Sequence, residues 1–389
     1  MPGEHGGTVQ ALEAFLPDTV IRPPGGPELA FFNVGSSEVV SIRVSVPLVE
    51  AVEEAGAAQI LRIQARDRMQ TLANRIGARA QVHRTGQALV YHVSGAVEDL
   101  DFLGWILRAG LAEPEADRFE AARREARIDL QQRQETPEGA LALRLLTALA
   151  PGAAPLQGSE GALDRLDSAR VTALWSRSHL RGELRIVAAG RLDPVLLLPI
   201  VTDLGLPEDG PTAQQPPSES TGTSRGAPEV IREWIGFGWE LNSEDTHAAQ
   251  LVSARLLSQT LRDAPGSYEA SVELWEIGRR RAVVVSGAAY PGNLPSLRQR
   301  LSGLPEEARS RVDDVRVEAA ASALRTELRA AARTPWDLTE LVGQGWDSQG
   351  SARAVADLLQ DLERVDVDAV LSFLDYLQSA SPVREELTP

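Results

Sequence analysis

The sequence predicts an α+β protein built from two tandem domains of similar structure, joined by a proline-rich linker. The 389-residue chain is long enough for two full hydrophobic cores, and 43% hydrophobic with 24% charged residues is ordinary for a globular protein. Hydrophobic periodicity disappears over Leu206–Ala227, where prolines mix with Gly, Ser, Thr and Gln. The flanking halves share a similar order of strand and helix patterns. We therefore expect a divergent tandem duplication, with domains over 1–205 and 228–389 and a linker over 206–227.

The first half alternates strand patterns with helix patterns. Strands are predicted where runs are β-branched or alternate with period two, at Leu29–Asn33, Val39–Val46, Ala78–His83, Ala88–Val93 and Leu184–Ala188. Helical patterns fill the intervals, at Ala51–Arg75, Val97–Ala112, Glu115–Arg133, Pro137–Ala148 and Ala169–Ser178. This order predicts layers in which helices cover a face of a sheet.

The second half repeats much of this order. Strands are predicted at Val230–Gly238, Tyr268–Trp275 and Arg281–Ser286. Helices are predicted at Thr246–Arg262, Leu294–Leu301, Asp313–Arg333, Ser351–Leu362 and Asp366–Ser379. The stretch Leu341–Gly350, which contains Gly343-Gln344-Gly345, is predicted to be a loop between helices.

Composition excludes several kinds of chemistry. The chain has no cysteine, which removes disulfides, thiol catalysis and cysteine-bound metal. It also has no lysine, so all 39 basic residues are arginine, and P-loop, Schiff-base and kinase-type sites are excluded. The net charge of −16 argues against a general affinity for nucleic acid. The basic run Arg279-Arg280-Arg281 is interpreted as the solvated start of a strand.

No stretch predicts a membrane segment or an export signal. The N-terminus Met1–Thr8 lacks a basic region followed by an apolar one, and no run of 18 apolar residues is present. We therefore expect a cytoplasmic protein with no membrane partner.

The stretch Gly56–Ile63 lies where a zinc motif is expected but contains no zinc ligand. It follows a strand pattern, opens a helix pattern and precedes another strand pattern. This context resembles the insulinase/pitrilysin-like (inverzincin) metallopeptidases, whose motif is H-x-x-E-H. On that motif Gln59 and Ile63 replace both histidines, and Arg62 replaces the glutamate that activates water. Glutamine is a poor ligand, isoleucine is none, and arginine places a fixed positive charge beside the site. We expect no metal in this chain and an ordinary amphipathic helix here.

The resemblance extends over nearly the whole chain. Leu184–Asp193 resembles the family's strand that ends in Gly-x-x-Asp, and Gly158-Ser159 with Leu163 resembles its Gly-Thr/Ser-x-x-x-Leu entry. The third zinc ligand of the family corresponds to Asp129, which we expect to be structural or solvated because one carboxylate binds zinc weakly. The implied fold is a pair of α/β roll domains, each a mixed, largely antiparallel sheet covered by helices.

The second half carries a candidate substrate-binding pair. Leu261–Tyr268 resembles the family's Leu-Arg signature followed by a glycine and a tyrosine, although the spacing is one residue shorter and Pro265 is unexpected. The resemblance implies that Arg262 holds a peptide backbone and that Tyr268 donates to an oxyanion in the partner's active site. The alternative is that Arg262 caps a helix and Tyr268 is a half-buried strand aromatic.

The other candidate motifs are weak. The five histidines, His5, His83, His92, His179 and His247, have no pair at the ligand spacing of a helix, so we interpret each as a surface or core residue. No nucleophile elbow and no dinucleotide fingerprint is present.

The sequence thus predicts a catalytically inactive subunit of a heterodimeric zinc peptidase. The homologous partner, with an intact H-x-x-E-H, would hold zinc, and this chain would complete the peptide-binding chamber. Abundant Ala, Gly and Arg indicate GC-rich coding, which favours leader-peptide removal from modified, lanthipeptide-like precursors as the specific role. The alternative is a structural or peptide-binding scaffold without a role in hydrolysis.

Overall fold

The structure is a computed structural model of the chain. It describes residues 14–151, 155, 158–191, 193–208, 232–241, 246–263, 269–277 and 280–388. The chain divides into two compact units, each assembled from three separate stretches. Unit 1 takes its residues from 1–128, 156–218 and 328–357, and unit 2 takes its residues from 129–155, 219–327 and 358–389.

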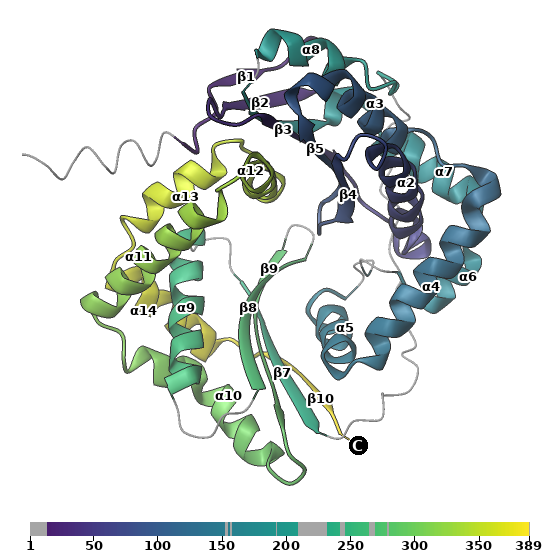
Figure 1. The fold of residues 1–389 in the computed structure, drawn as a ribbon. Helices are drawn as coiled ribbons and strands as arrows, with labels where there is room; N and C mark the ends of the chain where they lie inside the picture. The colour runs from purple at the N-terminus through teal and green to yellow at the C-terminus, as the bar shows by residue number, and fades with distance from the viewer. Residues whose placement is uncertain are drawn as a thin grey trace, which may run out of the picture. The chain divides into compact units, whose positions relative to one another are not determined.

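Unit 1 contains a six-stranded mixed sheet. Its strand order is β1-β2-β6-β3-β5-β4, in which β2 and β6 are parallel and the other neighbours are antiparallel (Figure 1). The strands are β1 (Thr19–Ile21), β2 (Glu28–Asn33), β3 (Val39–Pro47), β4 (Arg79–Arg84), β5 (Ala88–Ala96) and β6 (Arg185–Gly190).

The central strand β3 is buried on both faces although its sequence alternates. Its apolar residues Val40, Ile42, Val44 and Val46 lie on one face, and Ser41, Arg43 and Ser45 lie on the other. Helices α2 and α3 cover the apolar face, and α12 covers the polar face by packing on β3 and β6. The helices of unit 1 are α2 (Ala57–Ala73), α3 (Leu100–Leu111), α6 (Glu160–Arg165), α7 (Ser168–Ser178), α8 (Pro194–Thr202) and α12 (Pro335–Gln349).

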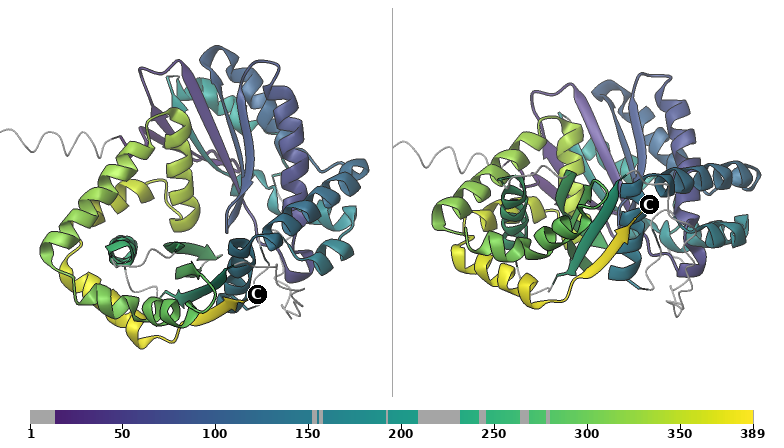
Figure 2. Two further views of the ribbon diagram at one scale, coloured as in Figure 1. Left: turned by 60° about the horizontal axis from the view of Figure 1, so that its bottom comes forward. Right: turned by 90° about the horizontal axis from the view of Figure 1, so that it is seen from below.

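Unit 2 contains a four-stranded antiparallel sheet with the order β10-β7-β9-β8. The C-terminal strand β10, yellow in Figure 2, lies at one edge of this sheet. Helices α9 and α10 pack on this sheet, and α5 packs on β7 and β10. The strands are β7 (Glu233–Glu240), β8 (Glu269–Ile277), β9 (Arg280–Ala289) and β10 (Val383–Leu387). The helices are α5 (Pro137–Leu149), α9 (His247–Asp263), α10 (Leu294–Arg309) and α14 (Val367–Ser379). Helices α4 (Phe119–Glu135), α11 (Asp314–Ala331) and α13 (Ala354–Leu362) each cross a boundary between the units.

The two sheets repeat one topology. The order β3, α2, β4, β5, α3 in the first half matches β7, α9, β8, β9, α10 in the second, and β6 and β10 each close their sheet. The shared strand order is β6-β3-β5-β4 in unit 1 and β10-β7-β9-β8 in unit 2, so β1 and β2 are additions. The predicted α+β fold with two similar domains is therefore confirmed.

Each unit includes a helix from the other half of the sequence. Helix α5 belongs to the first half but packs on the unit 2 sheet, and α12 belongs to the second half but packs on the unit 1 sheet. The helices hold equivalent places, because each follows a long helix and covers the matching strands of its sheet. Residues 209–227 of the predicted linker lie outside the described residues, so that boundary stays a prediction.

The predicted loop at Leu341–Gly350 is wrong, because nearly all of it lies inside α12. The two glycines of this stretch are typical of a loop. In the structure, Gly343 lies within the helix and lets it pack closely on Arg43, because any larger residue would place its Cβ against the Arg43 guanidinium. No element is predicted from the sequence at β1, α6 or β10, which are short, exposed or rich in charge.

Candidate functional site

The positions that correspond to the zinc motif lie on α2 and are packed as ordinary helix residues. Ile63 is 1% exposed and Gln59 is 6% exposed. Arg62 is turned back onto its own helix, since its Nε donates to Gln59 Oε1 at 2.9 Å. The helix begins at Gly56, which has φ +103°. A Cβ on Gly56 would lie 2.6 Å from Leu163, so this glycine allows close packing of two segments that carry the family resemblance.

The N-terminus of α2 is closed by an acidic residue that sequence analysis did not single out. Glu50 Oε1 accepts a hydrogen bond from the Ala58 amide at 2.6 Å, and Glu50 also pairs with Arg84. Burial raises the pKa of Glu50, while Arg84 and the amide oppose that shift. A carboxylate at a helix N-terminus accepts hydrogen bonds from the free backbone amides and interacts favourably with the positive end of the helix dipole. Glu50 therefore stabilises the start of the motif helix.

The remaining predicted site residues that the structure describes lie on other elements of the chain. Asp129 is half-buried on α4. Arg262 lies exposed in the last turn of α9, where its guanidinium bonds to the carbonyl and hydroxyl oxygens of Ser258 at 3.3 Å each. Tyr268 lies outside the described residues. The contacts of Arg262 agree with its interpretation as a helix cap, and its role toward a partner stays a prediction.

A buried polar network between the sheet of unit 1 and α12 was not predicted. Arg43 is fully buried on β3, and its Nη2 donates to Asp347 Oδ2 at 2.9 Å. Its Nε lies 3.3 Å from Glu340 Oε2, and it also donates to Ser45. Ser45 Oγ donates to Asp347 Oδ2 at 3.1 Å. Arg43 on β3 thus binds two carboxylates of α12, those of Asp347 and Glu340.

His92 extends this network along β5. Its Nε2 lies 2.8 Å from the hydroxyls of both Ser41 and Thr339, and its Nδ1 lies 3.2 Å from Glu340 Oε2. His83 Nε2 lies 3.1 Å from the other oxygen of Glu340. A carboxylate only accepts, so the tautomer of the neutral His92 ring that suits these neighbours has its proton on Nδ1, facing Glu340, and accepts at Nε2 from one of the two hydroxyls.

The protonation states follow from burial and these neighbours. Burial lowers the pKa of His92 to about 4, although Glu340 opposes this shift. Burial raises the pKa of Glu340, but hydrogen bonds from His83 and His92 and the charge of Arg43 lower it well below its usual range. At neutral pH the site therefore contains a neutral imidazole and an ionised carboxylate.

Ser41, His92 and Glu340 are ordered like the hydroxyl, imidazole and carboxylate of a hydrolase. Ser41 and His92 are both 0% exposed, so no substrate reaches the hydroxyl. The trio is accordingly a docking contact of α12. Among the described residues, no group of three or more His, Asp or Glu side chains is arranged to hold a metal ion.

An aromatic stack closes the network toward β4. The indole of Trp336 on α12 stacks on the His92 ring, with 3.4 Å between ring centroids and 13° between planes. The Arg79 guanidinium lies on the indole, 3.8 Å from its centroid. Trp336 is therefore sandwiched between a buried imidazole and the exposed cation of β4.

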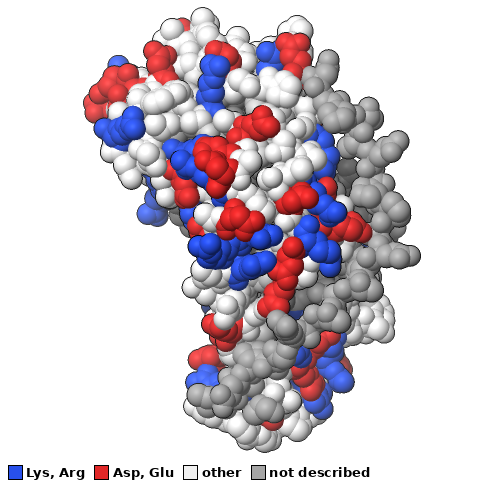
Figure 3. Space-filling model, turned by 90° about the vertical axis from the view of Figure 1, so that its right-hand side faces the viewer, with Lys and Arg blue, Asp and Glu red and all other residues white. Residues whose placement is uncertain are grey.

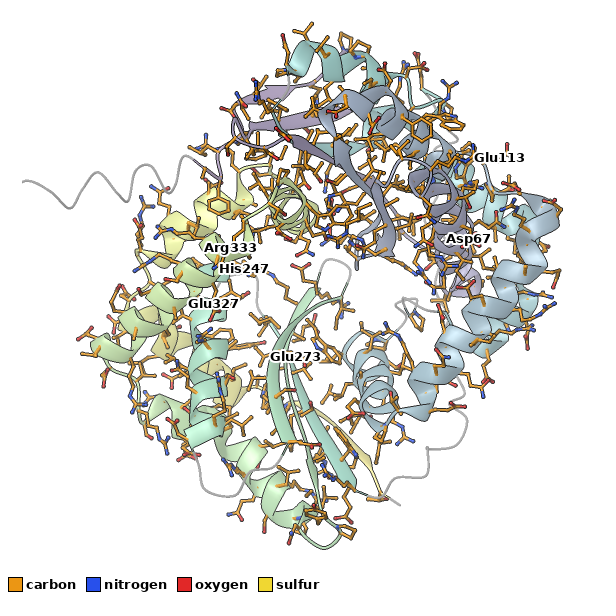
Figure 4. All side chains as sticks on the ribbon, in the orientation of Figure 1. Asp67, Glu113, His247, Glu273, Glu327 and Arg333 are labelled. Carbon is orange, nitrogen blue, oxygen red and sulfur yellow. The ribbon has the colours of Figure 1, made fainter. Side chains whose placement is uncertain are left out.

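The other described histidines are hydrogen-bonded within the protein, His179 in the core and His247 at a half-buried position. His179 Nε2 lies 2.7 Å from the Tyr91 hydroxyl, and burial lowers the pKa of His179 to about 3. In unit 2, His247 at the start of α9 lies 2.8 Å from Arg281 Nη1 (Figure 4). Burial, followed by the Arg281 charge, lowers the pKa of His247 to about 4.

The surface shows no large field of one sign on the face of Figure 3, where acidic and basic side chains are interspersed. Arg280 pairs with Glu240 at 3.3 Å, so the predicted basic run is partly neutralised. In the part of the chain that the structure describes, no helix is long and apolar enough to cross a membrane.

Comparisons with known proteins find similar structures but no similar sequence among family models and curated proteins. No family model and no curated protein matches the chain. A protease from Helicobacter pylori superposes with a TM-score of 0.82 at 12% identity, covering 96% of this chain and all of that chain. A peptidase M16 inactive domain from Pseudomonas fluorescens gives a TM-score of 0.79 at 12% identity, over 95% of this chain and 97% of that chain.

A third match is longer than this chain. The periplasmic protease PqqL from Escherichia coli gives a TM-score of 0.74 at 12% identity, over 96% of this chain and 46% of PqqL. At such identities the similarity establishes the fold alone. This chain has the fold of the M16 peptidases, the insulinase/pitrilysin-like group that the sequence resembles, and one of the structures with this fold is an inactive domain.

Proposed function

We propose that this chain is a catalytically inactive subunit of a heterodimeric zinc metallopeptidase. The observation that carries the proposal is the motif helix α2, where Gln59 and Ile63 stand at the histidine positions and Arg62 bonds to Gln59. Neither residue is a usual zinc ligand, and Arg62 adds a positive charge. An inactive domain among the structural matches supports the same role.

The fold offers this subunit a way to hold peptide. Strand β4 is the last strand of its sheet, and among the described residues it pairs with β5 only. An extended peptide can add to such an edge through main-chain hydrogen bonds. In the proposed complex, a homologous zinc subunit supplies the metal and the base, and this chain completes the chamber. Removal of leader peptides in the cytoplasm remains the proposed specific role.

Metal analysis and co-purification test the proposal first. The purified chain should hold no stoichiometric zinc and should not hydrolyse peptides alone. A tagged copy expressed in its natural host should bring down a homologous chain with H-x-x-E-H, and the mixture should hydrolyse peptide. One tightly bound zinc that is lost in Asp129→Ala would contradict the proposal, and so would peptidase activity of the isolated chain.

Site variants in the reconstituted pair test the contribution of the second half. Arg262→Ala should raise KM, and Tyr268→Phe should lower kcat/KM by on the order of 10²–10³, if the tyrosine donates to the oxyanion. Arg316→Ala is the matched control, because Arg316 is also an exposed helical arginine of unit 2. Assembly should remain intact in all three variants.

The second candidate is a peptide-binding scaffold without a role in hydrolysis. The contacts of Arg262 with Ser258 favour it, because they occupy the guanidinium within its own helix. If both variants in the pair process peptide at wild-type rates, the scaffold becomes the better account.

A further inference from the structure

The face of β4 that lies beside α12 carries three polar side chains at alternating positions. Arg79, Gln81 and His83 share this face, because Gln81 is opposite His92 in the β5 register and His92 contacts α12. Arg79 and Gln81 are exposed, and His83 is half-buried. A strand added to this edge would place every second side chain on the same face, about 4.5–5.5 Å from its neighbour on β4.

The Arg79 guanidinium is positioned by a cation–π contact that leaves its donors available to an anion. Its guanidinium lies 3.8 Å from the centroid of the Trp336 ring. Trp336 is itself 8% exposed and stacked on His92, so the platform under Arg79 is rigid. Among the described residues, Arg79 forms no ion pair with a carboxylate, in a chain with 55 acidic and 39 basic residues. A stacked guanidinium keeps its planar fork of donors available to a carboxylate.

The charge on this face is uneven along the strand. At the His83 end, the ionised carboxylate of Glu340 lies 3.1 Å from the imidazole, and its partner Arg43 is shared with Asp347. An acidic side chain placed beside His83 would face the Glu340 carboxylate. At the Arg79 end, the cation meets only the face of an indole. The edge therefore favours a negative charge at one position and not at the other.

We propose that β4 accepts an extended peptide segment and that Arg79 selects an acidic residue opposite it. This inference rests on the proposed role in peptide binding and specifies the class of peptide. The anion lies beside the guanidinium, with main-chain hydrogen bonds to the β4 edge fixing the register. The preference is local, since the net charge of the whole chain is −16 and would by itself favour basic peptides.

Peptide binding to the full chain tests this assignment. The probes are fluorescein-labelled ten-residue peptides of alternating Thr and Val, with Glu, Gln or Lys at one central position, measured by fluorescence polarisation. We expect the Glu peptide to bind about tenfold more tightly than the Gln peptide and the Lys peptide to bind most weakly. The preference should weaken as salt is raised.

Two variants separate Arg79 from general charge. Arg79→Glu should reverse the order, so that the Lys peptide binds more tightly than the Glu peptide. Arg75→Glu is the matched control, because it changes the charge equally at an exposed position just before β4, and it should leave the order unchanged. Circular dichroism of each variant checks that the fold is intact.

Each outcome decides a different point. Equal affinities for the three peptides, or an order unchanged in Arg79→Glu, would overturn the role of Arg79 and leave peptide binding in place. Undiminished binding of a Glu peptide with N-methylated alternate amides would overturn strand addition. If no peptide binds, both this inference and the peptide-holding part of the proposed function fail. The proposed zinc partner would still be judged separately, by co-purification and metal analysis.

Discussion

The two exchanged helices, α5 and α12, each pack on the sheet that is formed mainly by the other half of the sequence, one through apolar contacts and the other through ion pairs. Helix α12 meets β3 through buried charge, with Arg43 bound to Asp347 and Glu340. Helix α5 meets β7 through leucines: Leu145 packs at Gly236 and Leu149 packs at Gly238, where an added Cβ would lie 2.6 Å and 2.8 Å from their methyl groups. The same topology is thus stabilised once by ion pairs and once by close apolar packing.

The difference teaches where directional contacts matter. Hydrogen-bonded ions stabilise one position of a helix, because a shift leaves buried charges unpaired. Leucines against glycines contribute apolar burial that depends less on direction. The α12 interface also adjoins the exposed Arg79, so its fixed position keeps the Trp336 platform in place beside β4.

Removing the central cation should have the largest effect. Arg43→Met leaves two carboxylates without their partner, and we expect the opening free energy of α12 to fall by about 3–5 kcal/mol. Hydrogen exchange followed by mass spectrometry measures the opening of α12 and α5 separately. Arg309→Met is the control, because its pair with Asp375 is exposed and screened by solvent, so its loss should change stability little. A loss below 1 kcal/mol in Arg43→Met would mean that the network does not hold the helix.

Truncating the apolar contact should cost somewhat less. Leu145 is 1% exposed, and Leu145→Ala should lower the opening free energy of α5 by about 2–4 kcal/mol. The α12 amides should keep their protection. Equal loss of protection in both helices would show that the two interfaces are not independent.

Acid should weaken the docking of α12 through His92. Its pKa is about 4 in the folded protein and 6.5 ordinarily, so the unfolded state takes up a proton first as pH falls through this window. Stability is full above pH ~6.5 and should decrease by ~1–3 kcal/mol toward pH ~4. His92→Gln should flatten this dependence in α12, whereas His247→Gln, in unit 2, should leave it unchanged. A pH profile of α12 that is identical in wild type and His92→Gln would contradict the role of His92.

The smallest effect should be equal in the two helices. Thr136 and Thr334 each cap a helix that begins with proline, accepting from the amides of Gly139 at 3.2 Å and Asp337 at 3.1 Å. Replacing either threonine by alanine should cost about 1 kcal/mol, measured by exchange in the first turns. Unequal costs would show that docking, and not the cap, determines the stability of the helix start.

Much of the fold could be predicted because the repeated periodicities are strong. The strand patterns of β3, β5 and β9 and the long helices α9 and α11 lie close to their predicted bounds, whereas α2 begins six residues later than predicted. The exchange could not be predicted from periodicity, which is local. One available signal was the Thr-Pro pair that starts both α5 and α12, since Thr334-Pro335 repeats Thr136-Pro137 at equivalent places.

The site was predictable only where a motif resembled a known pattern. The packed state of Gln59 and Ile63 agrees with the expected amphipathic helix. The polar network could not be predicted, because Arg43 and Glu340 are far apart in sequence and because the sequence pattern predicts a loop at Leu341–Gly350, over most of α12. The alternation of Ser41, Arg43 and Ser45 with apolar residues is typical of a strand with one solvated face. In the structure, a helix that carries complementary charge covers that face.

The exchange of α5 and α12 bears on how the chain responds to cleavage. A cut between residues 209 and 231 separates the two sequence halves. Each unit is then built from both fragments, because unit 1 contains α12 from the second half and unit 2 contains α5 from the first half. The fragments should then remain associated without a covalent link. Conversely, a half expressed alone lacks the helix that covers one face of its sheet. We expect that exposed face to bind the equivalent helix of another copy, which would produce a domain-swapped oligomer.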